Sequence, residues 1–156
     1  MDTIKVKING IEVCAPKGST ILEAARLAHI EIPTLCFLKE INEIGACRIC
    51  VVEVKGARSL VASCVYPISE GMEIKTNSPK VLDSRRKTLQ LLLSNHDRKC
   101  LSCVRSGNCE LQRLAHDLNI HYQPYPVKPE RSRLEMDVPV IREASKCIKC
   151  MRCIQV

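Results

Sequence analysis

Ten of the eleven cysteines in this chain, together with one histidine, fall into three groups with the spacing of metal ligands. The groups are Cys36, Cys47, Cys50 and Cys64; then His96, Cys100, Cys103 and Cys109; then Cys147, Cys150 and Cys153. Thiolates bind soft metals, and repeated C-x2-C steps are typical of zinc sites and of iron–sulfur clusters. Three such centres in one chain would transfer electrons if they hold iron–sulfur clusters, and would only stabilise the fold if they hold zinc.

The first group places two thiolates on the tight loop that runs from Gly45 to Cys50. Gly45 allows the backbone to approach the sulfurs and to turn N–H donors towards them, which stabilises a more negative, reduced cluster. Four cysteines spaced as one, two and one fit a 2Fe-2S centre, although the first gap in plant-type ferredoxins is about 4 residues and here is 10. A zinc site with four thiolate ligands is the alternative.

The second group combines one histidine with three cysteines, a set that fits zinc as well as a 4Fe-4S cluster. Ligation by His96 would remove one negative charge relative to four thiolates, and would therefore raise the reduction potential of a 4Fe-4S centre. The third group resembles the C-x2-C-x2-C-x3-C run of bacterial 4Fe-4S ferredoxins, whose fourth cysteine would follow Val156. We therefore expect the chain to be a piece of a longer polypeptide that supplies a further ligand.

Composition excludes several other classes of protein. The formal charge of +7 could indicate nucleic-acid binding, but three anionic clusters would reduce it to roughly +2 or +3. The odd number of cysteines, the lack of an export signal and the C-x2-C spacing argue against disulfides. No run approaches about 18 apolar residues, so we expect a soluble, cytoplasmic protein without membrane insertion.

Hydrophobic alternation and turn residues predict an α+β first module. Residues 4–14 form a hairpin around Asn9-Gly10, and Thr20 with Glu23 forms a capping box that begins a helix ending near His29. Three short strands follow, at residues 51–54, 60–62 and 72–75. Cys14 lies in a strand pattern and belongs to no group, so it is expected to be a buried structural residue.

Helices are predicted for the second half of the chain. Ser78-Pro79 begins a helix whose stripe is Val81, Leu82, Leu89, Leu92 and Leu93, with Arg85, Arg86 and Lys87 facing solvent. Asn108 is expected to cap a further helix with Leu111, Leu114, Ala115 and Leu118 on one face. The remaining histidines are assigned to surface or capping positions: His29, His116 and His121.

Five short motifs, taken in order, resemble one family of redox subunits. The family comprises NAD(P)-linked FeFe hydrogenase catalytic subunits, NAD-dependent formate dehydrogenase large subunits and the large iron–sulfur subunit of respiratory complex I. The resemblance covers essentially the whole chain, and it is carried by Gly45-Ala46-Cys47-Arg48-Ile49-Cys50, Glu70-Gly71-Met72, Asn95-His96, Cys100-Leu101-Ser102-Cys103 and Asn108-Cys109-Glu110-Leu111-Gln112.

The resemblance implies four segments. Residues 1–78 would be a β-grasp, ferredoxin-like 2Fe-2S domain ligated by the first group, and residues 79–120 a small helical 4Fe-4S domain ligated by His96 and three cysteines. Residues 121–140, rich in proline, would be an extended linker. Residues 141–156 would begin a ferredoxin-like domain in which Cys147, Cys150 and Cys153 supply most of a further 4Fe-4S cluster.

The resemblance also implies an electron relay with no catalytic residue in this chain. Cys100-Leu101, where complex I members have Cys-Pro, and the final Cys-Ile-Gln-Val resemble the hydrogenase and formate dehydrogenase branches. Of these we favour the hydrogenase branch, which includes electron-bifurcating members. Expected partners are a flavin- and NAD(P)-binding subunit, a small 2Fe-2S subunit and ferredoxin, and nucleic acid is not expected. The alternatives are the same relay in a formate dehydrogenase or complex I-like subunit, a freestanding small ferredoxin-like subunit, and a zinc-stapled binding module.

Overall fold

The structure of the chain is a computed structural model that describes residues 2–126, 128 and 143–156. The chain forms two compact units. The first contains Met1–Arg85 and Met151–Val156, and the second contains Arg86–Cys150. Most of the predicted linker at residues 121–140 lies outside the described residues.

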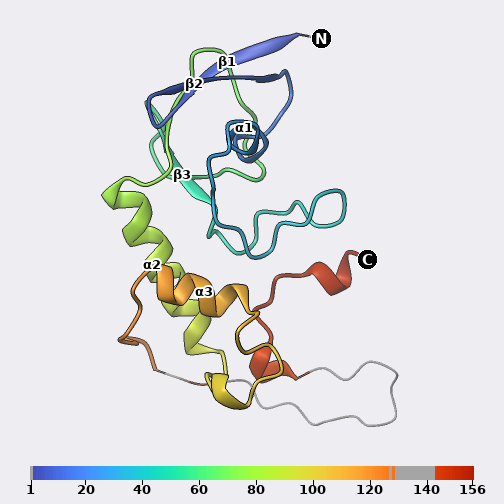
Figure 1. Cartoon of the computed structure of the whole chain (residues 1–156), viewed down its shortest axis with the longest axis vertical. Coiled ribbons are helices and arrows are strands. Elements are labelled where there is room, and N and C mark those ends of the chain that lie inside the picture. The colour runs from blue at the N-terminus through green and yellow to red at the C-terminus, as the bar shows by residue number, and fades with distance from the viewer. Residues whose placement is uncertain (1, 127, 129–142) are drawn as a thin grey trace. The chain divides into compact units, whose positions relative to one another are not determined.

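The first unit is built on a mixed five-stranded sheet with the strand order β2-β1-β5-β3-β4. Strands β1 and β5 pair in parallel, and the other neighbours are antiparallel. One helix, α1, lies beside the sheet (Figure 1). The elements are β1 (Thr3–Ile8), β2 (Ile11–Pro16), α1 (Ile21–Leu27), β3 (Val51–Val54), β4 (Val61–Ala62) and β5 (Glu73–Lys75). The predicted α+β class is confirmed.

Local sequence explains how these elements begin and end. Asn9 and Gly10 both have positive φ, as a two-residue hairpin turn requires, and Ile8 pairs with Ile11 across it. At the start of α1 the Thr20 hydroxyl accepts from the Glu23 N–H at 3.2 Å, and the Glu23 carboxylate accepts from the Thr20 N–H at 2.8 Å. The predicted hairpin and capping box are confirmed.

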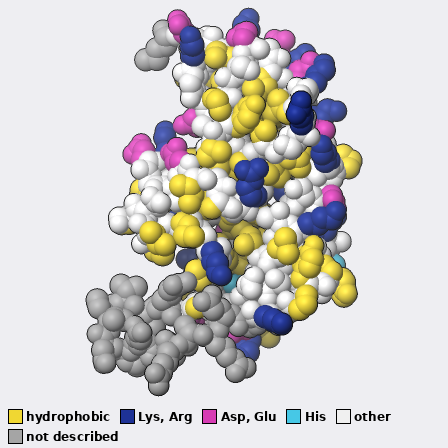
Figure 2. Space-filling view, turned by 180° about the vertical axis from the view of Figure 1, so that it is seen from behind, with side chains coloured by type: hydrophobic (Ala, Val, Ile, Leu, Met, Phe, Trp, Pro, Cys, Tyr) yellow, Lys and Arg dark blue, Asp and Glu magenta, His cyan; other side chains and the backbone are white. Residues whose placement is uncertain are grey.

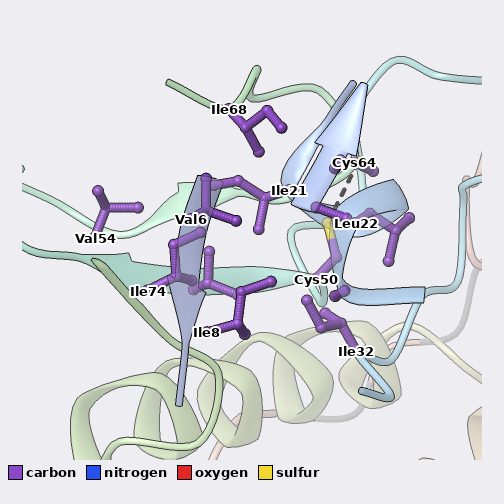
Figure 3. Close-up of a cluster of buried hydrophobic side chains, with 14 of the residues drawn as sticks. Val6, Ile8, Ile21, Leu22, Ile32, Cys50, Val54, Cys64, Ile68 and Ile74 are labelled. Atoms are coloured by element: carbon purple, nitrogen blue, oxygen red, sulfur yellow. Dashed lines mark hydrogen bonds between the residues drawn. The ribbon is translucent and has the colours of Figure 1, made fainter. Parts of the chain in front are cut away.

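The core of the first unit lies between the sheet and α1 (Figure 3). Val6 and Ile8 point inward from β1 because alternate strand residues share a face, and Ile21 and Leu22 meet them from α1. Cys50 and Cys64 belong to the same buried cluster. Packing of aliphatic side chains therefore fixes the positions of two cysteines that the sequence assigns to a metal centre.

Helix α2 (Pro79–Ser94) begins in the first unit and ends in the second, and its buried side differs from the predicted stripe at two positions. Arg85 is only 5 % exposed, whereas Leu82 is exposed. Arg85 lies four residues after Val81 and four before Leu89, both fully buried, so it occupies a position on the buried stripe of the helix. The assignments of Arg85 to solvent and of Leu82 to the apolar stripe were wrong; Arg86 and Lys87 are exposed as predicted.

The other helical elements are short. They are η1 (Cys100–Ser102), α3 (Glu110–Asp117), η2 (Ala144–Lys146) and η3 (Arg152–Ile154). Leu111, Leu114 and Leu118 of the α3 region are buried, as predicted. The N-cap of α3 is Cys109 and not Asn108, because the extended φ and ψ of an N-cap occur at Cys109, which makes no side-chain capping bond.

Cys14 also departs from its prediction, because its side chain is exposed on β2 while Val13 and Ala15 are buried. Strand alternation places neighbouring side chains on opposite faces, and both neighbours of Cys14 point into the core. The predicted surface positions of His29, His116 and His121 are confirmed.

The described surface is mixed in charge. Figure 2 shows Lys and Arg side chains spread over one face with Asp and Glu between them. Among the described residues, no helix is long and apolar enough to cross a membrane.

Candidate metal centres

The first group of cysteines lies in two pairs in the first unit. The N–H of Cys36 donates to the sulfur of Cys47, and the N–H of Cys47 donates to the sulfur of Cys36, both at 3.4 Å. The sulfurs of Cys50 and Cys64 are 3.3 Å apart (Figure 3). Two thiolates on one tetrahedral ion would be about 3.8 Å apart for metal–sulfur bonds of about 2.3 Å, so the Cys50 and Cys64 sulfurs are close to the spacing that one iron requires.

The loop that carries Cys47 has the backbone conformation predicted from Gly45. Gly45 has φ +64°, and a β-carbon there would lie 3.3 Å from Cγ2 of Val65. Arg48 also has a positive φ, of +57°, next to Cys47. The reciprocal N–H···S hydrogen bonds of Cys36 and Cys47 show that amide groups face the sulfurs, the arrangement that stabilises added negative charge.

Burial and hydrogen bonding perturb the acidity of these thiols. The Cys64 side chain hydrogen-bonds the Cys50 sulfur, which lowers the pKa of Cys50 to about 6 in spite of burial. The same hydrogen bond, burial and the nearby cysteines raise the pKa of Cys64. Burial raises the pKa of Cys36 as well. The Cys50–Cys64 pair therefore shares a proton that a bound metal would displace, as thiolate ligation requires.

Arginine side chains contact the backbone at both pairs. Arg85 donates to the carbonyl oxygens of Ile49 at 3.0 Å and Val51 at 2.8 Å. Arg152, in the C-terminal part of the first unit, donates to those of Cys36 at 3.1 Å and Phe37 at 2.9 Å. No sequence motif predicts these arginine–carbonyl contacts. For Arg85 alone there was a usable signal, because it lies at the i, i+4 position of a buried stripe.

The second group lies in the second unit on successive elements. His96 follows the end of α2, Cys100 begins η1, Cys103 is the C-cap of η1 and Cys109 is the N-cap of α3. All four side chains are partly buried. The Nδ1 atom of His96 is buried and has no hydrogen-bond partner among the described residues, and burial lowers the pKa of the imidazole. A neutral imidazole with an unsatisfied buried nitrogen has the state that a metal ligand needs.

The third group is divided between the two units. Cys147 and Cys150 lie in the second unit, where the Cys147 sulfur accepts from the Lys149 N–H at 3.4 Å. Cys153 lies in η3 and belongs to the first unit, where its side chain is exposed. The three cysteines are therefore placed by separate parts of the fold.

Within the described residues, no three His, Cys, Asp or Glu side chains are grouped around a position for a single metal ion. Two thiol pairs suit a centre with two irons, in which each iron takes two cysteines. The donors of the first group thus fit a 2Fe-2S cluster. The donor types of the second group fit a 4Fe-4S cluster with one imidazole ligand.

Comparison with family models finds two matches. Residues 1–79 match the 2Fe-2S iron–sulfur cluster binding domain, and residues 85–124 match the iron–sulfur binding region of NADH-ubiquinone oxidoreductase G.

Similar proteins include subunits of redox complexes. The NADP-reducing hydrogenase subunit HndD of Solidesulfovibrio fructosivorans is 44 % identical over 159 aligned residues, which cover 98 % of this chain and 27 % of that subunit. The NADPH-Fe(3+) oxidoreductase subunit alpha of Geobacter sulfurreducens is 36 % identical, with 98 % and 18 % covered. The chain thus spans between 18 % and 27 % of the length of these relatives.

Among solved structures, a chain of the NAD+-reducing [NiFe]-hydrogenase, crystallised in the H2-reduced state, has the same fold. It superposes with a TM-score of 0.89 at 29 % sequence identity, over 97 % of this chain and 64 % of the other.

Proposed function

Because this chain belongs to the family of 2Fe-2S iron–sulfur cluster binding domains, we propose that it is the electron-relay segment of an NAD(P)-linked oxidoreductase of the hydrogenase type. The observation that carries the proposal is the arrangement of four buried cysteines in two pairs, joined to a second region that matches a respiratory iron–sulfur subunit. Iron–sulfur clusters exchange single electrons, and they are the chemistry that this chain would supply when loaded.

We assign the ligands residue by residue. Cys36, Cys47, Cys50 and Cys64 would hold the 2Fe-2S cluster, and His96, Cys100, Cys103 and Cys109 would hold a 4Fe-4S cluster. Cys147, Cys150 and Cys153 would contribute three ligands to a further 4Fe-4S cluster. Aliphatic packing around Cys50 and Cys64 excludes water from the first centre and keeps the reorganisation on electron transfer small.

We propose partners of matching chemistry. A flavin- and NAD(P)-binding subunit would exchange electrons with the relay, together with a small 2Fe-2S subunit or ferredoxin, and a hydrogen-activating domain outside residues 1–156 would lie at the other end. The names of the relatives, an NADP-reducing hydrogenase subunit and an NADPH-Fe(3+) oxidoreductase subunit, support this choice. We place the complex in the cytoplasm. The second candidate is the same relay in a complex I-like subunit, which the match of residues 85–124 favours.

The test is anaerobic purification of the chain, followed by iron, zinc and acid-labile sulfide analysis, visible absorption and electron paramagnetic resonance (EPR) after reduction. We expect a brown protein with sulfide and with paramagnetic reduced centres, because zinc is d10 and colourless. The variant Cys64→Ser should lose the 2Fe-2S signal. The matched control is Cys14→Ser, which changes an exposed cysteine that belongs to no group and should leave the spectrum unchanged. Stoichiometric zinc without sulfide would refute the relay.

A further inference from the structure

Arg85 is a buried cation that pairs with no carboxylate in the part of the chain that the structure describes. Its side chain is 5 % exposed, on the face of α2 between Val81 and Leu89. Both of its recorded hydrogen-bond partners are neutral backbone carbonyls, and the ion pairs found among the described residues do not include it. A buried charge is strongly unfavourable unless an opposite charge compensates it.

The position of the two carbonyls indicates where the opposite charge lies. Ile49 and Val51 are the residues on either side of Cys50, so Arg85 grips the backbone around one cysteine of the first centre. Burial lowers the pKa of Arg85 to about 10. The guanidinium therefore stays charged at neutral pH, and the anionic cluster that Cys50 would help to hold would lie next to the backbone that it binds.

We propose that Arg85 is a positioning residue for the first centre, acting as the buried counter-charge of the cluster held by Cys36, Cys47, Cys50 and Cys64. This inference rests on the proposed function. A cluster with four thiolates is anionic, and reduction adds one more negative charge. A fixed cation beside Cys50 stabilises the reduced state more than the oxidised state, so it raises the reduction potential.

Simple anchoring of the loop does not account for an arginine at this position. A neutral amide side chain could donate to the same carbonyls without the penalty of a buried charge. Arg86, the next residue of the helix, shows the contrast: it is exposed and donates to the carbonyl of Leu118 at 3.1 Å in the second unit. The charge of Arg85 is stabilising only when the anion beside it is present.

The experiment is an EPR-monitored redox titration of the first centre in the full chain, with Arg85→Gln, Arg85→Lys and the control Arg86→Gln. In Arg85→Gln we expect the ratio of reduced to oxidised centre at a fixed potential to fall about tenfold, which for one electron is a shift of about 59 mV to more negative potential. Arg85→Lys keeps the charge and should remain near the wild-type midpoint. Arg86→Gln should do the same.

The other possible results of this titration also support or overturn the counter-charge role of Arg85. An unchanged midpoint in Arg85→Gln, or equal shifts in Arg85→Gln and Arg85→Lys, would overturn the counter-charge role. If Arg85→Gln cannot hold the centre while Arg85→Lys can, the requirement for charge is supported through assembly. If both lose it and Arg86→Gln keeps it, the shape of the guanidinium matters and its charge does not. A wild-type chain without iron would refute the proposed function itself.

Discussion

The buried nitrogen of His96 is the most informative single atom of the second centre. Within residues 2–126, 128 and 143–156 its Nδ1 has no hydrogen-bond partner, and burial lowers the pKa of the ring. A buried polar atom without a partner costs about 1–3 kcal/mol, and a metal ion bound to the ring would remove that cost. The proposed ligation can be tested by changing the charge of the donor at residue 96.

We predict that His96→Cys lowers the midpoint potential of the 4Fe-4S centre, by on the order of 100 mV. The thiolate adds one negative charge to the cluster and makes a further electron less favourable. Redox titration followed by EPR measures the shift, and the control is His116→Cys, which changes an exposed histidine on α3. An unchanged midpoint in His96→Cys would count against ligation by His96.

Single residues differ in how well the sequence predicted them. The cysteines and His96 were recognisable because ligand spacing is a strong pattern, and their assignment as ligands stays a prediction. Arg85 was assigned to solvent because charge usually means exposure, although its register placed it between Val81 and Leu89. Cys14 was assigned to the core because free cysteine is usually buried, although alternation along β2 turned it outward.

At the scale of elements, the loop before Cys47 depends on close packing against Val65. A side chain at Gly45 would need a left-handed φ of +64° and would lie 3.3 Å from Val65 Cγ2. Gly56 provides a matched comparison, because its φ is +87° but nothing lies within 4 Å of a β-carbon there. An alanine at Gly56 would therefore add backbone strain alone, whereas an alanine at Gly45 would add backbone strain and a steric contact with Val65.

We predict that Gly45→Ala lowers the free energy of unfolding by about 2 kcal/mol and reduces iron content of the first centre. Gly56→Ala should cost about 1 kcal/mol, from backbone strain alone, and leave iron content unchanged. Urea unfolding and iron analysis measure both effects. Equal losses of stability and full iron content in the two variants would contradict the packing argument.

Most elements of the first unit could be predicted, because their signals are local. Asn9-Gly10 specifies the hairpin and Thr20 with Glu23 specifies the start of α1. The end of the Cys103–Cys109 loop could not be predicted in the same way. Asn108 is a good N-cap by type, but the turn at Gly107 and Asn108 delays the helix until Cys109 takes that position.

At the scale of the whole molecule, the two units have unequal hydrophobic cores. In the first unit the sheet and α1 enclose one continuous cluster of buried residues. The described part of the second unit buries only a few hydrophobic side chains: Leu89, Leu93, Leu111, Leu114, Leu118 and Ala144. A small unit with a limited core depends more on its metal for stability.

We therefore predict that removal of iron by a chelator unfolds the second unit before the first. Amide hydrogen exchange should become fast in α3 while β1 and β5 keep most of their protection, because the core around Val6 and Ile74 is built mainly of aliphatic side chains. Loss of protection at the same rate in both units would show that the clusters support the whole chain equally.

Because the Cys14 side chain points outward, thiol labelling can report how many clusters the chain has bound. Ligated sulfur does not react with an alkylating reagent, so only unligated thiols take up label under non-denaturing conditions. With the first two centres filled, four of the eleven cysteines stay reactive, namely Cys14 and the three of the last group. Filling the last centre as well should leave Cys14 alone to be labelled, so mass spectrometry of the labelled chain would reveal whether residues 1–156 hold two clusters or three.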